Sequence, residues 1–426
     1  MKKTRFNFLF LVLILLLPVS LGAVDFGLLT NQYMGLSNDG GDDNNFEYSG
    51  SLIPRLSVLF GETGLFYTSG AFTIGYADEA YFVPELLRTE LSIRFGGFGI
   101  RAGRFNYTDP LSFIASGLFD GIQFSHTSRF GRFGLGAWYT GLQYKKAAKI
   151  RMTQEDERIY TSALDYNKFS DTYFAPRRMM AALNWEHPAL VGGLGIKTAV
   201  IGQMDFSDVH EKLNSQYFTL KFDIPVSNFV FELGGAFGVT QYRPPPIIPE
   251  GMEIEEVPEE LIIYPDYSSH FSFAGRFGFY YTLPTNFSSM VSFVVNHGSG
   301  YINDDIGGFT PITTRYFGNI LEVELPGLTA FSLDFAGRFH RTFGANATLS
   351  YFILNSLKTP NVLLPAEESN NNRLLGGEMF IRFVWSPVSD LQLTFAAGTF
   401  VPAWGNVFQE GKPHWRLDLT AVLAIY

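Results

Sequence analysis

The chain has 426 residues, of which 31 are Lys or Arg and 41 are Asp or Glu, so its formal net charge is −10. This acidic balance, without any run of basic residues, argues against a nucleic-acid partner, because contacts to phosphates need clustered Lys and Arg. There is no cysteine, which excludes a disulfide framework and a lipoprotein anchor. Beyond the N-terminus no segment has the uninterrupted run of about 18 apolar residues that predicts a transmembrane helix.

The N-terminus is typical of a secretion signal. Three basic side chains precede an apolar run over residues 8–17, and small residues follow up to Ala23. The run is too short to cross a bilayer, for which about 20 apolar residues are needed. We therefore expect residues 1–23 to be a cleavable signal peptide and residues 24–426 to form one domain. A lone transmembrane anchor is the alternative.

Much of the remaining chain alternates between apolar and polar residues with a period of two. In the segment 271–282, one face carries Phe271, Phe273, Phe277, Phe279 and Tyr281, and the other carries Arg276 and Tyr280. The segments 218–224, 229–239 and 391–398 alternate in the same way. Because lipid offers the backbone no hydrogen-bond partners, only a closed sheet of such strands can span a bilayer. The pattern predicts an all-β fold, a transmembrane antiparallel β-barrel of the bacterial outer membrane, and no convincing amphipathic helix.

The connections between these segments alternate between short and long, as in barrels of this class. The short connections have tight-turn compositions and are expected to face the periplasm; they are residues 61–64, 96–97, 129–131, 187–190, 225–228, 284–286, 344–346 and 387–390. The long connections are polar and are expected to face outside; they are residues 36–45, 77–84, 108–115, 145–174, 207–214, 242–267, 299–315, 357–372 and 401–414. Nine long and eight short connections give 18 strands with both termini in the periplasm.

One stretch leaves the strand count open. Residues 316–340 exceed the length of one strand and contain Pro326-Gly327. We interpret them as a single bulged strand because this preserves an even count, and 16 strands remain the alternative.

Two long loops carry unusual charge. Residues 145–174 mix clustered lysines with clustered acidic residues, and residues 242–267 contain three consecutive prolines and an acidic run. Because charge runs are ordinarily solvated, we expect both to be surface loops. The alternative for each loop is that it folds into the pore and constricts or plugs it.

The last segment runs from Trp415 to Tyr426 and ends the chain on an aromatic residue. It resembles the C-terminal signature that the barrel-assembly machinery recognises. Its apolar face, from Leu417 to Ile425, is one residue out of phase with Tyr426. The resemblance implies this machinery as a partner, and the barrel implies a bilayer with lipopolysaccharide or an equivalent outer lipid.

Strand parity places charged side chains on the lumen side of the wall. The candidates are Arg88, Glu90, Arg94, Arg101, Lys197, Lys221, Glu232, Arg276, Arg338, Arg382 and Arg416. The first four are expected to form one cluster. One interpretation is that such charges pair across strands and brace the wall. The other is that unpaired arginines form a basic track for anionic solutes, since rings of charge set ion preference in pores.

Two short motifs resemble a known family. Gly103-Arg104-Phe105, followed by a loop and then by Phe119-Asp120-Gly121, resembles a strand pair of the alginate-export porins. Phe317-Gly318-Asn319 is a second short similarity. The resemblance implies an 18-stranded monomeric pore with an arginine-rich lumen that passes acidic or sugar-like solutes. It assigns no ligand residue in this chain.

One local pattern suggests an enzyme. His297 and Ser299 are two residues apart at the outer end of a strand, so they point the same way, and parity places both on the lipid face. The pair is similar to that of outer-membrane phospholipase A and the lipid A deacylases, although no residue that would orient the imidazole can be identified. The seven histidines lack the spacing of a zinc site, and we expect neither a metal nor a cofactor.

These patterns favour a porin-like channel for passive diffusion of small hydrophilic, preferentially anionic solutes, and not an enzyme. Two alternatives stay open. One is an outer-membrane lipid hydrolase that uses Ser299 and His297, and the other is a plugged structural or adhesin barrel. The solute and the oligomeric state do not follow from the sequence.

Overall fold

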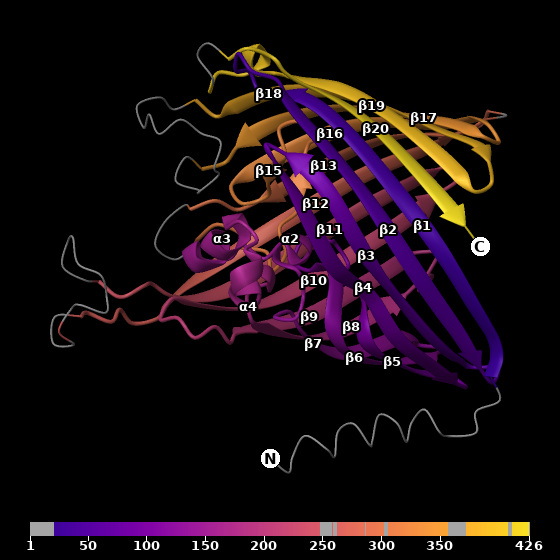
Figure 1. Ribbon diagram of the computed structural model, residues 1–426, viewed down its shortest axis with the longest axis horizontal. Coiled ribbons are helices and arrows are strands. Elements are labelled where there is room, and N and C mark those ends of the chain that lie inside the picture. The colour runs from indigo at the N-terminus through magenta and orange to yellow at the C-terminus, as the bar shows by residue number, and fades with distance from the viewer. Residues whose placement is uncertain are drawn as a thin grey trace.

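The computed structural model describes residues 21–247, 258, 262–285, 287–301, 306–356, 372–407 and 411–425. The wall is one sheet of 18 antiparallel strands that closes into a barrel (Figure 1). Its strands are β1 Leu21–Asn38, β2 Asn45–Phe60, β3 Gly64–Ala77, β4 Glu79–Phe95, β5 Phe98–Thr108, β6 Ser116–Ser128, β7 Gly131–Tyr139, β8 Arg178–His187, β9 Gly195–Asp205, β10 Lys212–Val226, β11 Phe229–Arg243, β12 Ser268–Leu283, β13 Ser288–Gly298, β16 Leu328–His340, β17 Phe343–Leu354, β18 Leu374–Val388, β19 Leu391–Val401 and β20 His414–Ile425. The expected 18-stranded barrel is confirmed, and the 16-strand alternative is wrong.

The barrel closes between its first and last strands. β1 pairs with β2 on one side and with β20 on the other, where Met34 lies opposite Leu419 and Leu28 opposite Ile425. Closure removes the two edges that an open sheet would expose, so the backbone groups of these strands find partners within the wall. β1 begins and β20 ends at the end of the barrel that carries the short turns.

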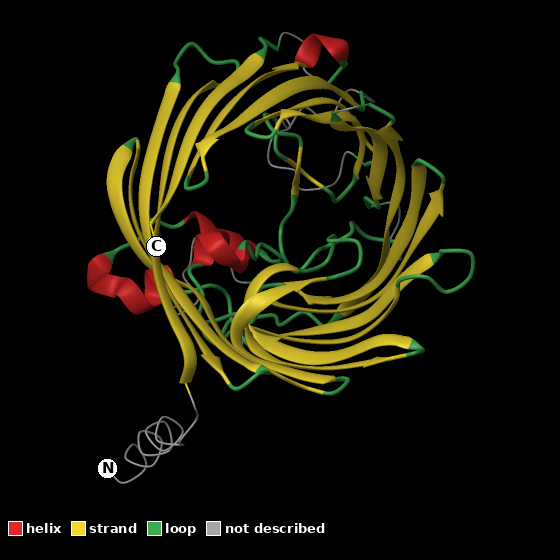
Figure 2. Cartoon of the chain, turned by 90° about the vertical axis from the view of Figure 1, so that its right-hand side faces the viewer, coloured by secondary structure: helices red, strands yellow, loops and turns green. Residues whose placement is uncertain are grey.

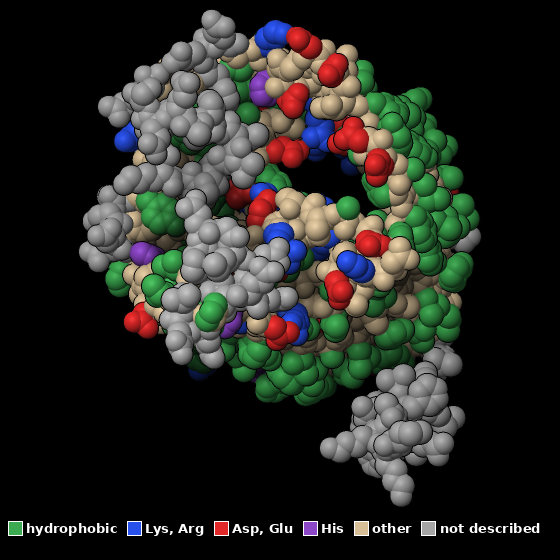
Figure 3. Space-filling model, turned by 60° about the vertical axis from the view of Figure 1, so that its left-hand side comes forward, with side chains coloured by type: hydrophobic (Ala, Val, Ile, Leu, Met, Phe, Trp, Pro, Cys, Tyr) green, Lys and Arg blue, Asp and Glu red, His purple; other side chains and the backbone are tan. Residues whose placement is uncertain are grey.

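Alternation along each strand sorts the side chains between two faces. On β12, Phe271, Phe273 and Phe277 point outward and are exposed, whereas Ser272 and Ala274 point inward and are buried. Apolar side chains cover the flank of the barrel that is visible in Figure 3. A closed barrel with this apolar exterior fits a bilayer, since lipid-facing residues alternate with lumen-facing ones. Within the described ranges, no helix has the length and apolarity needed to cross a membrane.

Two of the expected connections are wrong. Only Asp78, with a φ of 61°, separates β3 from β4, because the β-branched and aromatic residues around Val83 extend the strand through the region expected to be a loop. The turn before β17 lies at residues 341–342 and not at 344–346. Asn346 is instead a strand residue that pairs with Arg382 on β18.

Residues 316–340 are not a single bulged strand. β16 begins only at Leu328, and the residues before it belong to a long loop. Within that loop, β14 (Tyr316–Phe317) and β15 (Val323–Glu324) form a small hairpin apart from the wall. Gly327 adopts a φ of 64° at the end of the loop, a conformation that glycine reaches without strain.

Short helices occupy the long loops, although no helix was expected. They are α2 Lys145–Ala148, α3 Gln154–Thr161, η1 Tyr166–Lys168, α4 Phe169–Tyr173 and η3 Pro402–Trp404. Figure 2 shows that one helix lies inside the ring of strands and another lies outside it. At the start of α3, the Thr153 hydroxyl accepts from the backbone of Asp156, and the Asp156 carboxylate accepts from the backbone of Thr153. This reciprocal cap fixes the first turn of the helix.

The wall has a seam between β4 and β5. These strands pair only between Thr89–Phe95 and Phe98–Arg104, so the Glu79–Arg88 part of β4 has no partner strand on this side. Backbone carbonyls along such an edge need other donors. Side chains supply them: Tyr166 donates to Phe82, Tyr173 to Pro84, and Arg104 to Leu86. The η1–α4 segment therefore closes the seam in place of a strand.

Candidate functional site: the lumen and its loops

The structure brings three of the four expected neighbours on β4 and β5 together. Glu90 is only 4% exposed and lies between Arg88 and Arg101, whose guanidinium nitrogens are 2.6 and 2.7 Å from its carboxylate. The two cations on either side compensate the buried carboxylate, as expected if these charges brace the wall. Arg94 lies apart from this group, next to the β4–β5 turn.

Other lumen charges also form ion pairs. On the opposite part of the wall, Glu232 is 3.2 Å from Lys221 and 2.7 Å from Arg276. Arg416 lies 3.0 Å from Asp418 on the same strand and 2.9 Å from Glu322 of the long loop before β16. The remaining candidate cation with a partner is Lys197, 3.5 Å from Glu186. These pairs stiffen the wall and offset part of the charge at their positions.

Three of the candidate cations differ from the rest. Arg94, Arg338 and Arg382 form no ion pair with any described residue, and all three are exposed. Arg338 donates to the backbone of Arg341, and the Arg382 guanidinium lies 5.5 Å from the ring centre of Phe380. Their charge is therefore not offset by a nearby carboxylate, and all three lie on the half of the barrel towards the short turns.

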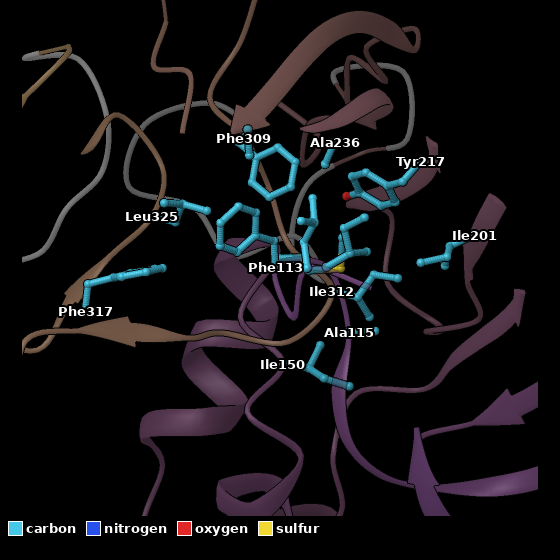
Figure 4. Close-up of a cluster of buried hydrophobic side chains, with 14 of the residues drawn as sticks. Phe113, Ala115, Ile150, Ile201, Tyr217, Ala236, Phe309, Ile312, Phe317 and Leu325 are labelled. Carbon is cyan, nitrogen blue, oxygen red and sulfur yellow. The ribbon is translucent and has the colours of Figure 1, made fainter. Parts of the chain in front are cut away.

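The loops at the other end meet inside the ring of strands. Leu111 and Phe113, from the loop after β5, pack against apolar side chains of the 145–174 loop and of the loop before β16. Figure 4 shows this cluster against residues of the β9–β11 wall. Its fully or almost fully buried members include Leu111, Phe113, Ile114, Ile150, Phe309, Ile312, Leu325, Ile201, Tyr217 and Ala236. Burial of this much apolar surface holds the loops against one side of the barrel.

Backbone bonds fix the same three loops to one another. The Ile312 amide donates to the Ile114 carbonyl at 2.8 Å, and the Thr314 amide donates to the Lys149 carbonyl at 2.8 Å. The Tyr217 hydroxyl on β10 donates to the carbonyl of Thr310. The expectation that residues 145–174 form a solvated surface loop is therefore wrong for residues 145–157. Residues 248–257 and 259–261, half of the 242–267 loop, lie outside the described residues.

A buried ion pair anchors α3 to the wall. Arg178, the first residue of β8, is 1% exposed and lies 2.5 Å from Asp156 and 3.3 Å from Asp205. It also donates to the carbonyl of Leu213 at 3.0 Å. Burial raises the pKa of Asp156 despite the attraction of Arg178. The docking of the 145–174 loop thus depends on Arg178, a buried cation that faces the carboxylates of Asp156 and Asp205.

The sequence matches no family model and no curated protein. Solved structures match over nearly the whole chain. The Pseudomonas aeruginosa protein OccK5 (OpdH) is 11% identical with a TM-score of 0.58, over 95% of this chain and 99% of that chain. The outer membrane protein OpdK of the same organism is 9% identical with a TM-score of 0.56, over 95% and 100%. The fold is that of bacterial outer-membrane porins.

A further similar porin structure contains a ligand. OccK2 (OpdF) of Pseudomonas aeruginosa, in complex with glucuronate, is 11% identical with a TM-score of 0.57, over 95% of this chain and 99% of that chain. At such low identity the similarity shows the shared porin fold and assigns no solute. It does not bear on the resemblance to the alginate-export porins.

Within the porin fold, the motif behind that resemblance has a structural role. Arg104 and Asp120 lie opposite each other on β5 and β6 and form a two-point ion pair at 2.9 and 2.7 Å. Gly103 has a φ of 106°, and a Cβ there would lie 2.0 Å from the Thr89 carbonyl oxygen. The glycine lets β4 and β5 approach closely at the point where their pairing ends.

The structure separates the two residues of the suspected hydrolase. His297 stacks on the lipid-facing ring of Phe273, and its Nδ1 lies 3.0 Å from the Thr329 hydroxyl and 3.2 Å from the Asn355 amide. Ser299 lies beyond the end of β13 and is 1% exposed. Its hydroxyl donates to the Gly307 carbonyl at 3.0 Å and accepts from a backbone amide. The expectation that both face lipid is wrong for Ser299, whose proton is not shared with the imidazole.

Sequence reasoning missed the residues that hold the loops inside the lumen. Arg151 binds Glu157 within the 145–174 loop and connects that loop to Glu324 of the small hairpin, and Arg178 binds Asp156. One local signal was present, since Thr153-x-x-Asp is a capping sequence that predicts a helix start. No local pattern identifies partners that lie so far along the chain.

Proposed function

We propose that this porin-fold protein is an outer-membrane channel for passive diffusion of small hydrophilic solutes, with its short turns in the periplasm. The observation that carries the proposal is the hollow beside the loop cluster in Figure 3, which acidic and basic side chains border. A wall of 18 strands encloses more space than its own side chains fill. The loop cluster packs against the β9–β11 side, so it narrows the lumen from one side.

The proposal includes a preference for anionic solutes. Its support is the exposed positive charge of Arg94, Arg338 and Arg382, which no described carboxylate offsets. Positive side chains that line a pore attract anions into it. Small carboxylates, acidic sugars among them, are the class that fits, and this is also the class that the alginate-export resemblance implies.

The route to the membrane is part of the same proposal. Residues 1–23 would be removed as a signal peptide; residues 1–20 lie outside the described part of the chain. The assembly machinery would recognise β20, and the apolar exterior would contact the bilayer with lipopolysaccharide or an equivalent outer lipid.

Conductance across a planar bilayer tests the channel. The mature protein, refolded in detergent, is expected to insert and give discrete current steps, with a reversal potential in a salt gradient that indicates anion preference. A refolded barrel that resists SDS in unheated gel samples but gives no current would contradict the channel and favour the plugged barrel. Hydrolysis of a lipid ester, abolished by Ser299→Ala, would instead favour the hydrolase.

A further inference from the structure

A cavity of about 460 Å³ lies between the loop cluster and the β11–β12 wall. The 151–157 segment and the loop before β16 form one side of the cavity, and strand residues such as Thr240 and Tyr242 form the other. It is therefore at the long-loop end, away from the exposed arginines near the short turns. Its volume is enough for a solute of the size of a monosaccharide.

The charged groups that line this cavity are predominantly acidic. Among the described residues, the carboxylates are those of Glu157, Glu211 and Glu324, and the one cation is Arg151. Arg151 is already committed, because it binds Glu157 through two nitrogens and reaches Glu324 at 2.7 Å and the Tyr316 hydroxyl at 2.6 Å. With the lining His270 neutral, one cation against three carboxylates leaves a net charge of −2.

Glu211 is positioned and buried. It is 5% exposed, and its oxygens accept from the amides of Gln154 and Glu155 and, at 2.8 Å, from the hydroxyl of Tyr242. No cation pairs with it among the described residues. Each carboxylate oxygen can accept more than one hydrogen bond, so capacity remains for a donor from a solute.

A second, independent feature marks the cavity as incomplete. Thr240 lines it and is only 6% exposed, yet its hydroxyl has no hydrogen-bond partner among the described residues. A buried hydroxyl without a partner is unfavourable, and such groups in folded proteins call for an explanation. The hydroxyl oxygen is itself covered, so a polar solute in the cavity would become its partner once a neighbouring side chain shifts.

We infer that this cavity binds a small solute that carries an ammonium group, with Glu211 as the main acceptor and the Thr240 hydroxyl as a second polar contact. An ammonium offers only donors, which matches Glu211, the lining carboxylate that no described cation pairs with. Tyr242 and Tyr301 also line the cavity, and the face of an aromatic ring can attract a cation. A carboxylate solute would meet repulsion here, since no uncommitted cation lines the cavity in the part of the chain that the structure describes.

The inference rests on the proposed channel, because a site at the long-loop end serves uptake only where a path leads onward. Three probes on one pyranose scaffold separate the charge classes: glucosamine, glucose and glucuronate. Calorimetric titration of the detergent-solubilised protein at low salt is expected to show glucosamine binding more tightly than either of the others. Equal affinity for all three, tighter binding of glucuronate, or no binding of glucosamine would overturn the inference.

Two variants test the residues. Glu211→Gln is expected to weaken glucosamine binding by about tenfold or more, because it removes a charge-assisted bond. Thr240→Val keeps the shape and breaks no existing bond, so it is expected to fold, to melt no lower than wild type and to weaken binding by about threefold to tenfold. Glu62→Gln, on the β2–β3 turn at the other end, is the control and should bind as wild type does.

Binding and conduction are measured separately. Glucosamine binding without any current would leave the inference standing and contradict the proposed channel. A conducting barrel in which Thr240→Val binds glucosamine as tightly as wild type would leave the channel standing and overturn the inference.

Discussion

Arg104 and Asp120 face each other across β5 and β6 as a fork, with Nε to Oδ1 at 2.9 Å and Nη2 to Oδ2 at 2.7 Å. The same guanidinium donates to the carbonyl of Leu86 on β4 and, at 2.9 Å, to that of Leu142 in the loop after β7. One side chain thus connects three strands and a loop where β4 and β5 part. The Arg104 side chain is 6% exposed, so water does not replace these bonds.

The first prediction follows from this fork. Arg104→Lys keeps the charge but offers a point donor that cannot serve four oxygens. We expect the free energy of unfolding to fall by about 3 kcal/mol, as when a buried pair loses its geometry. Denaturant titration of the refolded barrel measures this. Arg129→Lys, on an exposed turn, should change it by less than about 0.5 kcal/mol. Equal midpoints for wild type and Arg104→Lys would contradict the role assigned to the fork.

The wall could be predicted from the sequence because its signals are local. Alternation in segments such as 271–282 places phenylalanines on lipid and Arg276 inside, and the structure agrees for Phe271, Phe273, Phe277 and Arg276. Turn positions failed where polarity was mistaken for a loop, as around Asp78. The docking of the loops could not be predicted, because partners such as Asp156 and Arg178 are brought together only by the closed barrel.

The same limit applied to the lumen charges. Strand parity indicated which side chains point inward, but whether a cation is paired depends on neighbours from other strands or loops. Arg416 meets Glu322 of a distant loop, whereas Arg382 faces Asn346 and Ala396 in the strand register. The residues next to Arg416 and Arg382 in the sequence do not indicate which of the two is paired.

A second prediction concerns Arg178. Arg178→Met would leave Asp156 buried without its cation, and Asp205 would keep only Lys212, 4.0 Å away; we expect a cost of about 3 kcal/mol or more. Since the loop can leave the lumen while the wall stays closed, we expect α3 to undock and single-channel conductance to rise. Proteolysis after Lys146 and Lys149 should accelerate. Arg158→Met is the control, because that arginine is 71% exposed and pairs within the helix. If conductance and proteolysis change as much in Arg158→Met as in Arg178→Met, Arg178 does not anchor α3.

The third prediction concerns pH. Burial raises the pKa of Asp109, Asp156 and Glu324, all of which lie in the docked loops. The docked loops therefore bind more protons than undocked loops would, so docking becomes more stable as pH falls from neutral towards these raised pKa values and weakens as pH rises. Hydrogen exchange of residues 145–161, corrected for intrinsic rates, is expected to be slower at lower pH. Asp156→Asn should flatten this dependence, and faster corrected exchange on acidification would contradict it.

The last prediction concerns ion selectivity. Arg101 is bound to Glu90 at 2.7 Å, so replacing it is expected to weaken the wall more than to change selectivity. Arg338 and Arg382 are exposed and lack an ion pair among the described residues. If they attract anions, Arg338→Glu combined with Arg382→Glu should move the reversal potential towards cations and leave the barrel folded, because lumen substitutions tune selectivity.

Salt and a matched control make this prediction decisive. The shift should be large near 0.1 M salt and small near 1 M, because the screening length falls from about 10 Å to about 3 Å. Arg158→Glu combined with Lys412→Glu makes the same change in charge on exposed side chains at the long-loop end, and it should shift the potential less. Anion preference that survives the Arg338 and Arg382 replacements at low salt would show that other groups set the selectivity. A local effect of Arg338 and Arg382 requires that their replacement shift the reversal potential more than the control replacement does. Equal shifts in both double variants would mean that only the overall charge of the protein matters.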